Sequence, residues 1–305
     1  MLDKIKINNI KRIMLTLLRR KHATKTGIVT DTGLSNSTVS SCVNSLLELK
    51  LLVVDGMEDS AGGRRSSIYR INGAYGRFIG VDMRKDAMVV VVTDCENHVL
   101  SSTVYPFRAD KPTINCLLEV LDTVLAQNEN VLGIGIGLSG SLDHQEQVVI
   151  SNPDYEWQFV HLKEIVERQY LIFTYIDHRV NGAAVSEGMV GSACEQENYL
   201  YIGENSGEKA ALVLNSQLCR GVDNTTGQIP ERELNRLMSS EMLNFLGVSS
   251  VLIGYRTEGF KDKLYQSISD FTGEIICIRQ TNDTYPAGMA AITQREWFES
   301  IYFML

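Results

Sequence analysis

The sequence predicts an α/β protein with a small winged helix-turn-helix domain at residues 1–74 and a larger two-lobed α/β body at residues 75–305. Two observations predict this division. Residues 1–72 contain 12 Lys and Arg against 6 Asp and Glu, a balance of +6, whereas residues 73–305 contain 17 against 31, a balance of −14. Near residue 78 the hydrophobic pattern also changes from helical spacing to alternating strands. A basic head on an acidic body is expected of a protein that places one end on a polyanion.

The first element is predicted as an amphipathic helix over 5–20. Its apolar side contains Ile10, Ile13 and Leu17 at helical spacing. The remaining surface is basic, and it consists of Lys11, Arg12, Arg19, Arg20 and Lys21. For a single residue the simpler interpretation is a solvated helix face, but as a group these cations favour contact with phosphates.

Residues 24–48 have the pattern of a helix-turn-helix. A short helix over 24–32 is followed by Gly33, which can adopt the left-handed conformation of a tight turn at little steric cost. Ser35 is expected to cap a second helix, whose buried stripe contains Val39, Val43, Leu46 and Leu47. The opposite face is small, polar and free of carboxylates, as a helix that enters the major groove requires.

Two short strands, at 51–54 and 68–71, flank a glycine-rich tip and predict a wing. Arg64 and Arg65 follow two glycines at this tip, where they can reach phosphates or a narrow minor groove. The alternative is a solvated turn between two strands. The predicted DNA-binding residues are Lys25, Asn36, Ser37, Thr38, Ser40, Ser41, Asn44, Arg64 and Arg65.

The body alternates strands and helices, which predicts α/β architecture with a largely parallel inner sheet. Strands are predicted at 78–83, 88–93, 100–105, 131–137, 171–176, 199–202, 210–214, 218–220, 251–253 and 275–278. Helices are predicted at 113–127, 161–169, 180–192, 231–245, 258–269 and 287–301. Lobe one is expected to cover about 75–192 plus the C-terminal helix, and lobe two about 193–286.

Composition argues against several other classes of protein. No apolar run approaches the roughly 18 residues that span a bilayer, and the first residues lack the apolar region of a signal peptide, so we expect a cytoplasmic protein without a membrane partner. The six cysteines stand singly, with no Cys-x-x-Cys pair and no His at ligand spacing. They are expected to be reduced thiols that act as small hydrophobes.

The order of these motifs resembles the ROK family (repressor, open reading frame, kinase), and specifically its transcriptional regulators. The matching residues are Thr32-Gly33-Leu34-Ser35 with Thr38-Val39-Ser40, Gly62-Gly63-Arg64-Arg65, Gly133-Ile134-Gly135-Ile136-Gly137 with Gly140 and Asp143, Asn181-Gly182-Ala183-Ala184 with Glu187-Gly188, and Arg220-Gly221-Val222 leading to Gly227-Gln228-Ile229. The resemblance implies that the body has the two-lobed actin-like (ribonuclease H-like) fold of sugar kinases.

Both phosphate-binding loops of the kinases depart from the family pattern. The family has Asp-x-Gly-Gly-Thr after its first strand, whereas this chain has Asp82-Met83-Arg84-Lys85-Asp86. Without the two glycines, backbone amides cannot approach a nucleotide closely. The second loop is Asn205-Ser206-Gly207-Glu208-Lys209, in which Glu208 adds a negative charge where phosphate would lie.

The resemblance also identifies lost catalytic chemistry. The family's Glu-Asn-Asp-Ala-Asn, whose Asp is the general base, aligns with Asp177-His178-Arg179-Val180-Asn181. Arg179 therefore occupies the position of the base, and a guanidinium cannot accept the proton. Gly227-Gln228-Ile229-Pro230-Glu231 replaces the family's Gly-Glu-Ile-Gly-His, and the Cys-rich zinc segment is missing. Phosphoryl transfer is not expected, and no cofactor, neither ATP nor zinc, is predicted.

The resemblance places an effector, a sugar or sugar phosphate, in the cleft between the lobes. The position-matched residues are Asn152, His178, Arg179, Gln228 and Glu231, and Trp157 nearby is better explained as core packing. The expected function is sequence-specific binding of double-stranded DNA, as a repressor of carbohydrate genes. A homodimer or dimer of dimers on a palindromic operator is expected. The alternatives are a sugar kinase of the same fold and a ligand-independent regulator whose body only dimerises.

Overall fold

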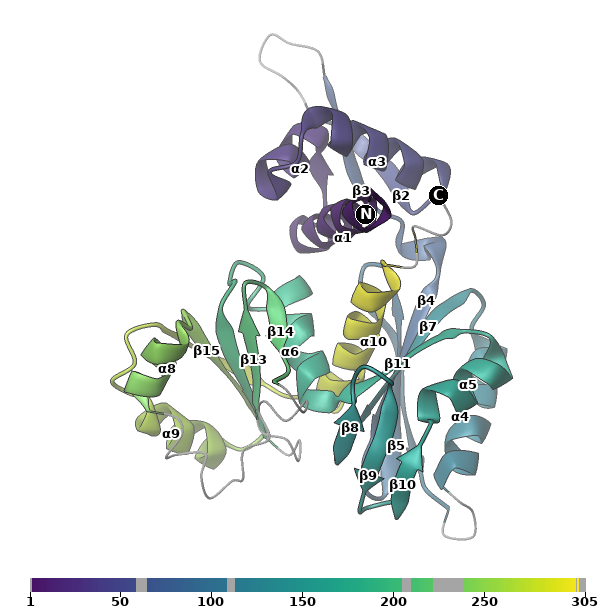
Figure 1. The fold of residues 1–305 in the computed structure, drawn as a ribbon, viewed down its shortest axis with the longest axis vertical. Helices are drawn as coiled ribbons and strands as arrows, with labels where there is room; N and C mark the ends of the chain where they lie inside the picture. The colour runs from purple at the N-terminus through teal and green to yellow at the C-terminus, as the bar shows by residue number, and fades with distance from the viewer. Residues whose placement is uncertain are drawn as a thin grey trace.

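The computed structural model describes residues 2–58, 65–108, 113–204, 210–221, 239–299 and 301. A small domain, the head, is stacked on a body with two lobes (Figure 1). Among the described residues, no helix has both the length and the apolar character that crossing a membrane requires.

The head has the predicted winged helix-turn-helix architecture. Its elements are α1 (Leu2–Arg20), β1 (Ala23–Thr24), α2 (Lys25–Thr32), α3 (Asn36–Glu48), β2 (Leu52–Glu58) and β3 (Ser66–Ile71). The strands form an antiparallel sheet in the order β1-β3-β2. Gly33 ends α2 with φ 63°, and the Ser35 side chain accepts a hydrogen bond from the Thr38 amide at the start of α3. The turn and the cap are therefore those that the sequence predicts.

Lobe one is built on a five-stranded sheet in the order β11-β7-β4-β5-β6. Its elements are η1 (Gly73–Tyr75), β4 (Arg77–Met83), β5 (Ala87–Asp94), β6 (Val99–Pro106), α4 (Thr113–Gln127), β7 (Val131–Leu138), α5 (Leu162–Tyr170) and β11 (Phe173–His178). Strands β11, β7 and β4 are parallel, and β5 and β6 extend the sheet in antiparallel pairing. Helices α4 and α5 pack on one face of this sheet.

A second, three-stranded sheet in lobe one was not predicted. It consists of β8 (Ser141–Asp143), β9 (Val148–Asn152) and β10 (Trp157–Val160), paired antiparallel in the order β10-β9-β8. These strands are three to five residues long and are separated by polar turns, so their alternation is too short to distinguish from a loop.

Lobe two contains the other five-stranded sheet, in the order β14-β13-β12-β15-β16. Its elements are β12 (Tyr199–Gly203), β13 (Ala210–Leu214), β14 (Gln217–Cys219), α8 (Ser240–Leu246), β15 (Ser250–Tyr255), α9 (Glu258–Ser267) and β16 (Glu274–Arg279). The helix predicted over 231–245 lies partly outside the described residues. One continuous helix over this range was wrong, because Ser239 is extended and its side chain caps α8, which starts only at Ser240.

Helices α6 (Arg179–Val190) and α10 (Thr284–Trp297) lie between the two large sheets (Figure 1). Helix α10 begins three residues earlier than predicted, because Pro286 is accommodated in its first turn, where no intrahelical amide donor is needed. It crosses β4 and β7 on a face made of glycines. A Cβ on Gly80 would lie 1.8 Å from the Pro286 carbonyl oxygen, and one on Gly135 would lie 2.2 Å from Thr293 Oγ1. The Gly-x-Gly-x-Gly run of β7 is thus the contact surface for α10.

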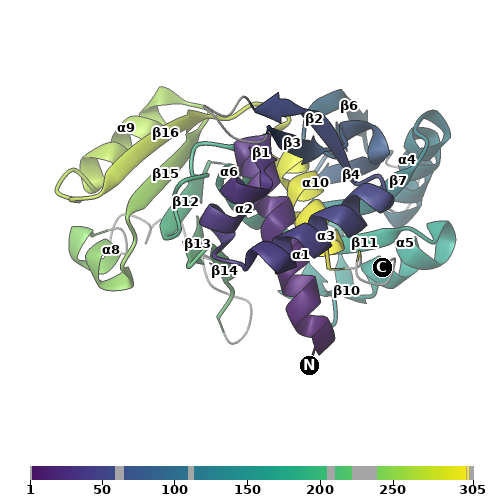
Figure 2. The ribbon, with the colours of Figure 1, turned by 90° about the horizontal axis from the view of Figure 1, so that it is seen from above.

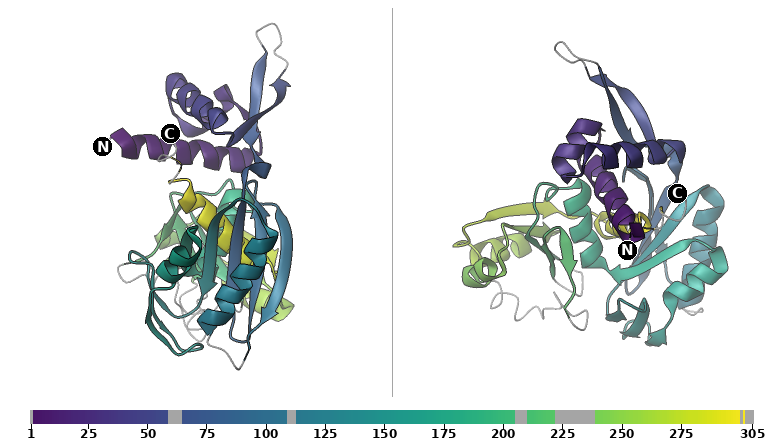
Figure 3. Two further views of the ribbon diagram at one scale, coloured as in Figure 1. Left: turned by 90° about the vertical axis from the view of Figure 1, so that its right-hand side faces the viewer. Right: turned by 45° about the horizontal axis from the view of Figure 1, so that its top comes forward.

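The head and lobe one share one hydrophobic core. Buried Ile13 and Leu17 of α1 belong to the same cluster as Met189 of α6 and Trp297 of α10. Figure 3 shows α1 lying between the rest of the head and the body.

Part of the basic surface of α1 is bound to the protein itself, and the phosphate contacts predicted for this surface stay a prediction. Lys11 pairs with Glu299 at 2.7 Å, Arg12 donates to the Thr32 carbonyl oxygen, and Arg20 pairs with Asp31. These bonds join α1 to the C-terminal end of the body and to α2.

Candidate functional site

The outer face of α3 is the candidate surface for nucleic acid. Asn36, Ser37, Ser41 and Asn44 are exposed, and Thr38 and Ser40 are half-buried. The opposite face, with Val39, Cys42, Val43 and Leu46, packs into the head. Seen from above, α2 and α3 lie over α1 on the side of the head that faces away from the body (Figure 2). The predicted polar face of α3 therefore lies on the exterior of the molecule.

Lys25 and Asn44 are brought together, although they come from different helices. The Lys25 ammonium donates to Asn44 Oδ1 at 2.9 Å and lies 5.8 Å from the centre of the Tyr69 ring. Arg65 is exposed at the start of the second wing strand. Arg64 and the two glycines before it lie outside the described residues, so the predicted role of Arg64 stays a prediction.

The carboxyl ends of the parallel strands β4 and β11 carry two buried aspartates. Asp82 at the end of β4 accepts a hydrogen bond from Arg84 Nε at 2.6 Å and pairs with Arg179 Nη1 at 3.3 Å. Arg179 also donates to the Met83 carbonyl oxygen at 2.6 Å. Two guanidinium groups therefore surround the carboxylate that the family resemblance places at the nucleotide site.

The described effector candidates are buried and bonded to their own chain. Asn152 donates to the Ser139 carbonyl oxygen at 2.8 Å and accepts from the Asp154 amide at 3.0 Å, so its amide shapes the neighbouring loop. His178 is buried and precedes Arg179 at the start of α6. Trp157 is buried in the core of lobe one, as its simpler interpretation predicted. Gln228, Glu231 and the second phosphate loop at 205–209 lie outside the described residues.

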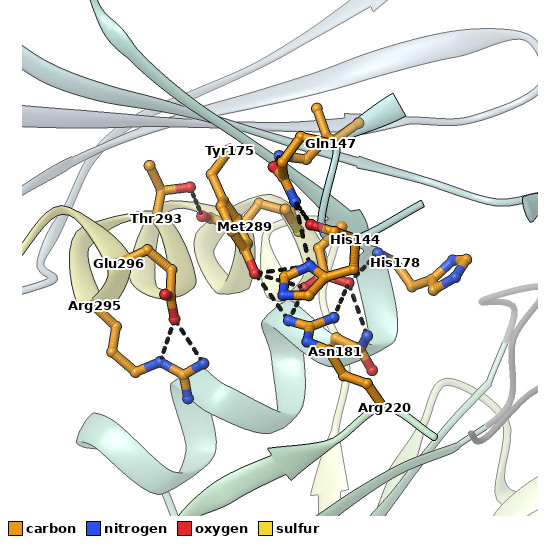
Figure 4. A network of polar contacts seen from close by, with 12 residues as sticks. His144, Gln147, Tyr175, His178, Asn181, Arg220, Met289, Thr293, Arg295 and Glu296 are labelled. Carbon is orange, nitrogen blue, oxygen red and sulfur yellow. Dashed lines mark hydrogen bonds and ion pairs between the residues drawn. The ribbon is translucent and has the colours of Figure 1, made fainter. Parts of the chain in front are cut away.

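A polar network around Asp177 was not predicted (Figure 4). Arg220, from lobe two, donates to both carboxylate oxygens of Asp177, at 3.1 and 2.6 Å. Asn181 donates to the same carboxylate at 2.8 Å, and Arg220 also donates to the Tyr175 hydroxyl at 2.8 Å. Burial alone would raise the pKa of Asp177, but the charge of Arg220 and these hydrogen bonds lower the pKa to about 2. The carboxylate therefore stays ionised at neutral pH.

His144 lies at the edge of this network. Its ring stands edge-on to the Tyr175 ring, and its Nδ1 lies 3.2 Å from Gln147 Nε2. Burial, and then the nearby charge of Arg220, lower the pKa of His144. The sequence offered one indirect signal of the network, because an aspartate at the end of an apolar strand needs a buried partner.

Within the described ranges, one group of side chains could hold a metal ion. Oxygen and nitrogen atoms of Asp94, Glu96 and His98, at the turn after β5, lie within 4.8 Å of one another. Asp94 Oδ1 accepts the amides of Glu96 and His98, at 2.8 and 2.9 Å, and Glu96 pairs with Arg70 of the head at 3.3 Å. These bonds give the three side chains a structural role, because they stabilise the turn and connect it to the head.

The chain combines a winged helix-turn-helix head with a two-lobed α/β body. The ROK family model matches residues 78–232, and the chain belongs to this family. It is 26% identical to the xylose repressor of Bacillus subtilis (strain 168) over 231 residues, which are 74% of this chain and 60% of that protein. The xylose repressor of Caldicellulosiruptor bescii is 24% identical over 73% of this chain and 58% of that protein. The chain thus spans about three fifths of the length of these relatives.

Solved structures show the same fold. The crystal structure of a ROK family transcriptional regulator, a homologue of the MLC protein of E. coli, superposes with a TM-score of 0.77 over 98% of both chains, at 14% identity. A ROK family glucokinase from Streptomyces griseus, in complex with glucose and AMPPNP, superposes with a TM-score of 0.58 over 72% of this chain and all of that chain, at 15% identity.

Proposed function

We propose that this protein is a sequence-specific DNA-binding repressor of carbohydrate-related genes, and that it has no kinase activity. The observation that carries the proposal is the winged head, in which the exposed face of α3 bears Asn36, Ser37, Ser41 and Asn44. The sequence-based expectation of a face without carboxylates holds for its first three turns only, because exposed Glu48 ends the helix on the same side. Amide and hydroxyl side chains on such a helix can bind base edges and phosphates. The similarity to xylose repressors supports the same function.

The lack of kinase activity is supported by the surroundings of Asp82. A kinase of this fold uses carboxylates in the cleft to hold metal ions and to accept a proton. Here Arg84 and Arg179 bind Asp82 directly. The family resemblance aligns Arg179 with the proton acceptor of the kinases. A coupled assay with ATP and D-glucose or D-xylose is expected to show no turnover. Turnover that disappears in the Asp177→Asn variant would favour the kinase alternative.

The test of DNA binding begins with selection of bound duplexes from random fragments. The affinity for a selected operator is expected to fall at least about tenfold between 50 and 200 mM salt, because Lys and Arg contacts release counterions. A palindromic selected site would support binding by a homodimer or a dimer of dimers, whose two recognition helices lie about 34 Å apart. If no duplex is enriched, the proposed function is wrong.

A single charge on α3 gives a sharper test. The Ser41→Asp substitution places a carboxylate on the exposed face of the helix and is expected to weaken operator binding at least about tenfold, since losing one good base contact costs roughly 1–3 kcal/mol. The matched control is Ser269→Asp, the same change at an exposed position after α9. Gel-shift titration should show wild-type affinity for the control and reduced affinity for Ser41→Asp.

The proposed effector is a sugar or sugar phosphate that binds between the lobes. A thermal-shift experiment with D-xylose and phosphorylated xylose as probes tests it, because a ligand at 100 times its dissociation constant adds about 2.7 kcal/mol to the stability of the native state. Stabilisation by neither probe would favour a regulator whose body only dimerises.

A further inference from the structure

Arg220 and Asp177 join the two lobes through their edge strands. Asp177 lies at the end of β11, the edge strand of the lobe one sheet, and Arg220 directly follows β14, the edge strand of the lobe two sheet. Arg220 Nη1 and Nη2 donate to Asp177 Oδ1 and Oδ2, at 3.1 and 2.6 Å. This bidentate geometry is the strongest form of a guanidinium–carboxylate pair.

The pair is shielded from water, which makes it costly to break. The Asp177 side chain is fully buried and that of Arg220 is 17% exposed. The His178 amide and Asn181 Nδ2 also donate to Asp177, at 2.7 and 2.8 Å. If the lobes separated, these groups would stay in lobe one and the carboxylate would lose its counterion in a buried site. The ion pair therefore favours this relative position of the lobes.

Arg220 also lies beside the head. A groove of about 900 Å³ lies beside the packed contact of α1 with the body, and Arg220 lines it together with Lys11, Arg12 and Leu15 of α1 and His144 and Glu296 of lobe one. On the other side of the ion pair, α6 starts two residues after Asp177 and packs against α1. A displacement of Arg220 from Asp177 would thus change two surfaces that face α1.

We propose that the Arg220–Asp177 ion pair is a latch that holds the lobes in the state that binds the operator. This inference rests on the proposed function of the protein. In the latched state the ion pair is formed, and in the open state lobe two has moved away and the pair is broken. An effector that binds between the lobes opens them only if its binding free energy favours the open state by more than the ion pair stabilises the latched state. Release of the latch then alters the support of α1 and lowers operator affinity.

The experiment uses the full chain and four variants: Arg220→Gln, Asp177→Asn, the double variant with both changes, and Arg168→Gln. The last is the matched control, because Arg168 forms an exposed ion pair with Glu164 within α5. Hydrogen–deuterium exchange of peptides over 173–178 and 217–221 measures the latch, and gel shift measures operator affinity. For Arg220→Gln we expect at least tenfold faster exchange in both peptides and at least tenfold weaker operator binding, with wild-type values for Arg168→Gln.

The double variant keeps the test decisive if a lone buried charge prevents folding. It has no buried charge at this contact, so it should fold and still show faster exchange and weaker operator binding than the wild type. Wild-type exchange and affinity in a folded Arg220→Gln or double variant would overturn the latch. If the wild type itself binds no DNA, the proposed function is wrong. Hydrogen exchange tests the latch independently of DNA binding, because exchange that is unchanged in the variants would show that the ion pair does not hold the lobes together.

Discussion

At the carboxyl end of β4, Asp82 is bound by Arg84 and Arg179, and this arrangement is the basis of the proposal that the protein is not a kinase. A carboxylate in an active kinase must remain available to a metal ion, whereas both oxygens of Asp82 face protein cations. Arg179 reaches Asp82 from the start of α6 and Arg84 from the loop after β4. Arg179, which the family resemblance aligns with a proton acceptor, thus forms a structural crosslink between α6 and β4.

The Asp82→Asn substitution is predicted to lower stability strongly. It leaves the two guanidinium groups close together without their carboxylate, and removing one partner of a buried ion pair typically costs about 3–5 kcal/mol. Urea unfolding measures the loss. The control is Asp262→Asn at an exposed position of α9, where a change within about 0.5 kcal/mol is expected. Equal stabilities of the two variants would show that Asp82 is not part of a stabilising crosslink.

His144 is predicted to make stability depend on pH. Burial and the charge of Arg220 lower its pKa in the folded protein, so below the unfolded value of about 6.5 the unfolded chain binds more protons than the folded one. The contribution of neutral His144 to the free energy of unfolding is then fully present above about pH 6.5. It decreases as the pH falls toward the lowered pKa of the folded state. Between pH 7 and 5.5 the wild type should lose more unfolding free energy than His144→Gln. Parallel pH profiles would contradict this assignment.

The sequence and the family resemblance together predicted that Arg179 replaces a general base, but they did not predict its partner. Asp82 is 97 positions away in sequence, and only the fold brings the strand end and the helix start together. The same limit applies to Arg220, whose partner Asp177 belongs to another sheet. The type of residue at position 179 predicted the loss of a general base. The ion pairs that Arg179 and Arg220 form could not be predicted, because they depend on the tertiary structure.

At the scale of elements, the helices and long strands followed from hydrophobic periodicity, and the glycine run at 133–137 is explained by packing. Gly135 faces α10 so closely that a Cβ would lie 2.4 Å from the Met289 carbonyl oxygen. The sequence could not show this, because the partner helix lies more than 140 residues further along the chain. The short strands β8, β9 and β10 were missed because runs of three to five residues carry little periodicity.

The Gly135→Ala substitution is therefore predicted to destabilise the protein by about 1–3 kcal/mol or more, the usual cost of overpacking. The matched control is Gly259→Ala in α9, where a Cβ would meet no atom within 4 Å. Alanine is the better helix former, so the control is expected to be neutral or stabilising by up to about 1 kcal/mol. Thermal unfolding of both variants measures the difference. A stable Gly135→Ala variant would mean that α10 does not rest on this face of β7.

At the scale of the whole molecule, the head is attached to the body by more than a linker. Buried side chains of α1 share a cluster with α6 and α10, and Lys11 pairs with Glu299 beyond the end of α10. Because α6 and α10 also lie between the lobes, a change in lobe position reaches α1 through direct packing. This arrangement can connect the proposed effector site in the body to α3, the proposed recognition helix, by direct packing.

The shared core predicts that the head and lobe one unfold together. The two tryptophans, Trp157 in lobe one and Trp297 in the shared cluster, report on the body by fluorescence, and hydrogen exchange of α1 peptides reports on the head. Their urea midpoints should coincide, as expected for one cooperative unit. The Met189→Ala substitution in α6, beside Leu15 of α1, should lower both midpoints together by an amount equivalent to about 2–5 kcal/mol, because it opens a cavity at the contact.

Met242→Ala in α8 is the matched control for this prediction, since Met242 is exposed and its loss should change stability by less than about 0.5 kcal/mol. An independent head would behave differently, because its α1 peptides would keep wild-type protection in Met189→Ala while the tryptophan midpoint fell. In that case the body could not transmit lobe movement by packing, and regulation of the head would have to depend on the chain connection at residues 72–76 and on the Lys11–Glu299 and Arg70–Glu96 ion pairs. Coincident midpoints in both the wild type and Met189→Ala would instead make the interface between α1 and α6 the route of coupling.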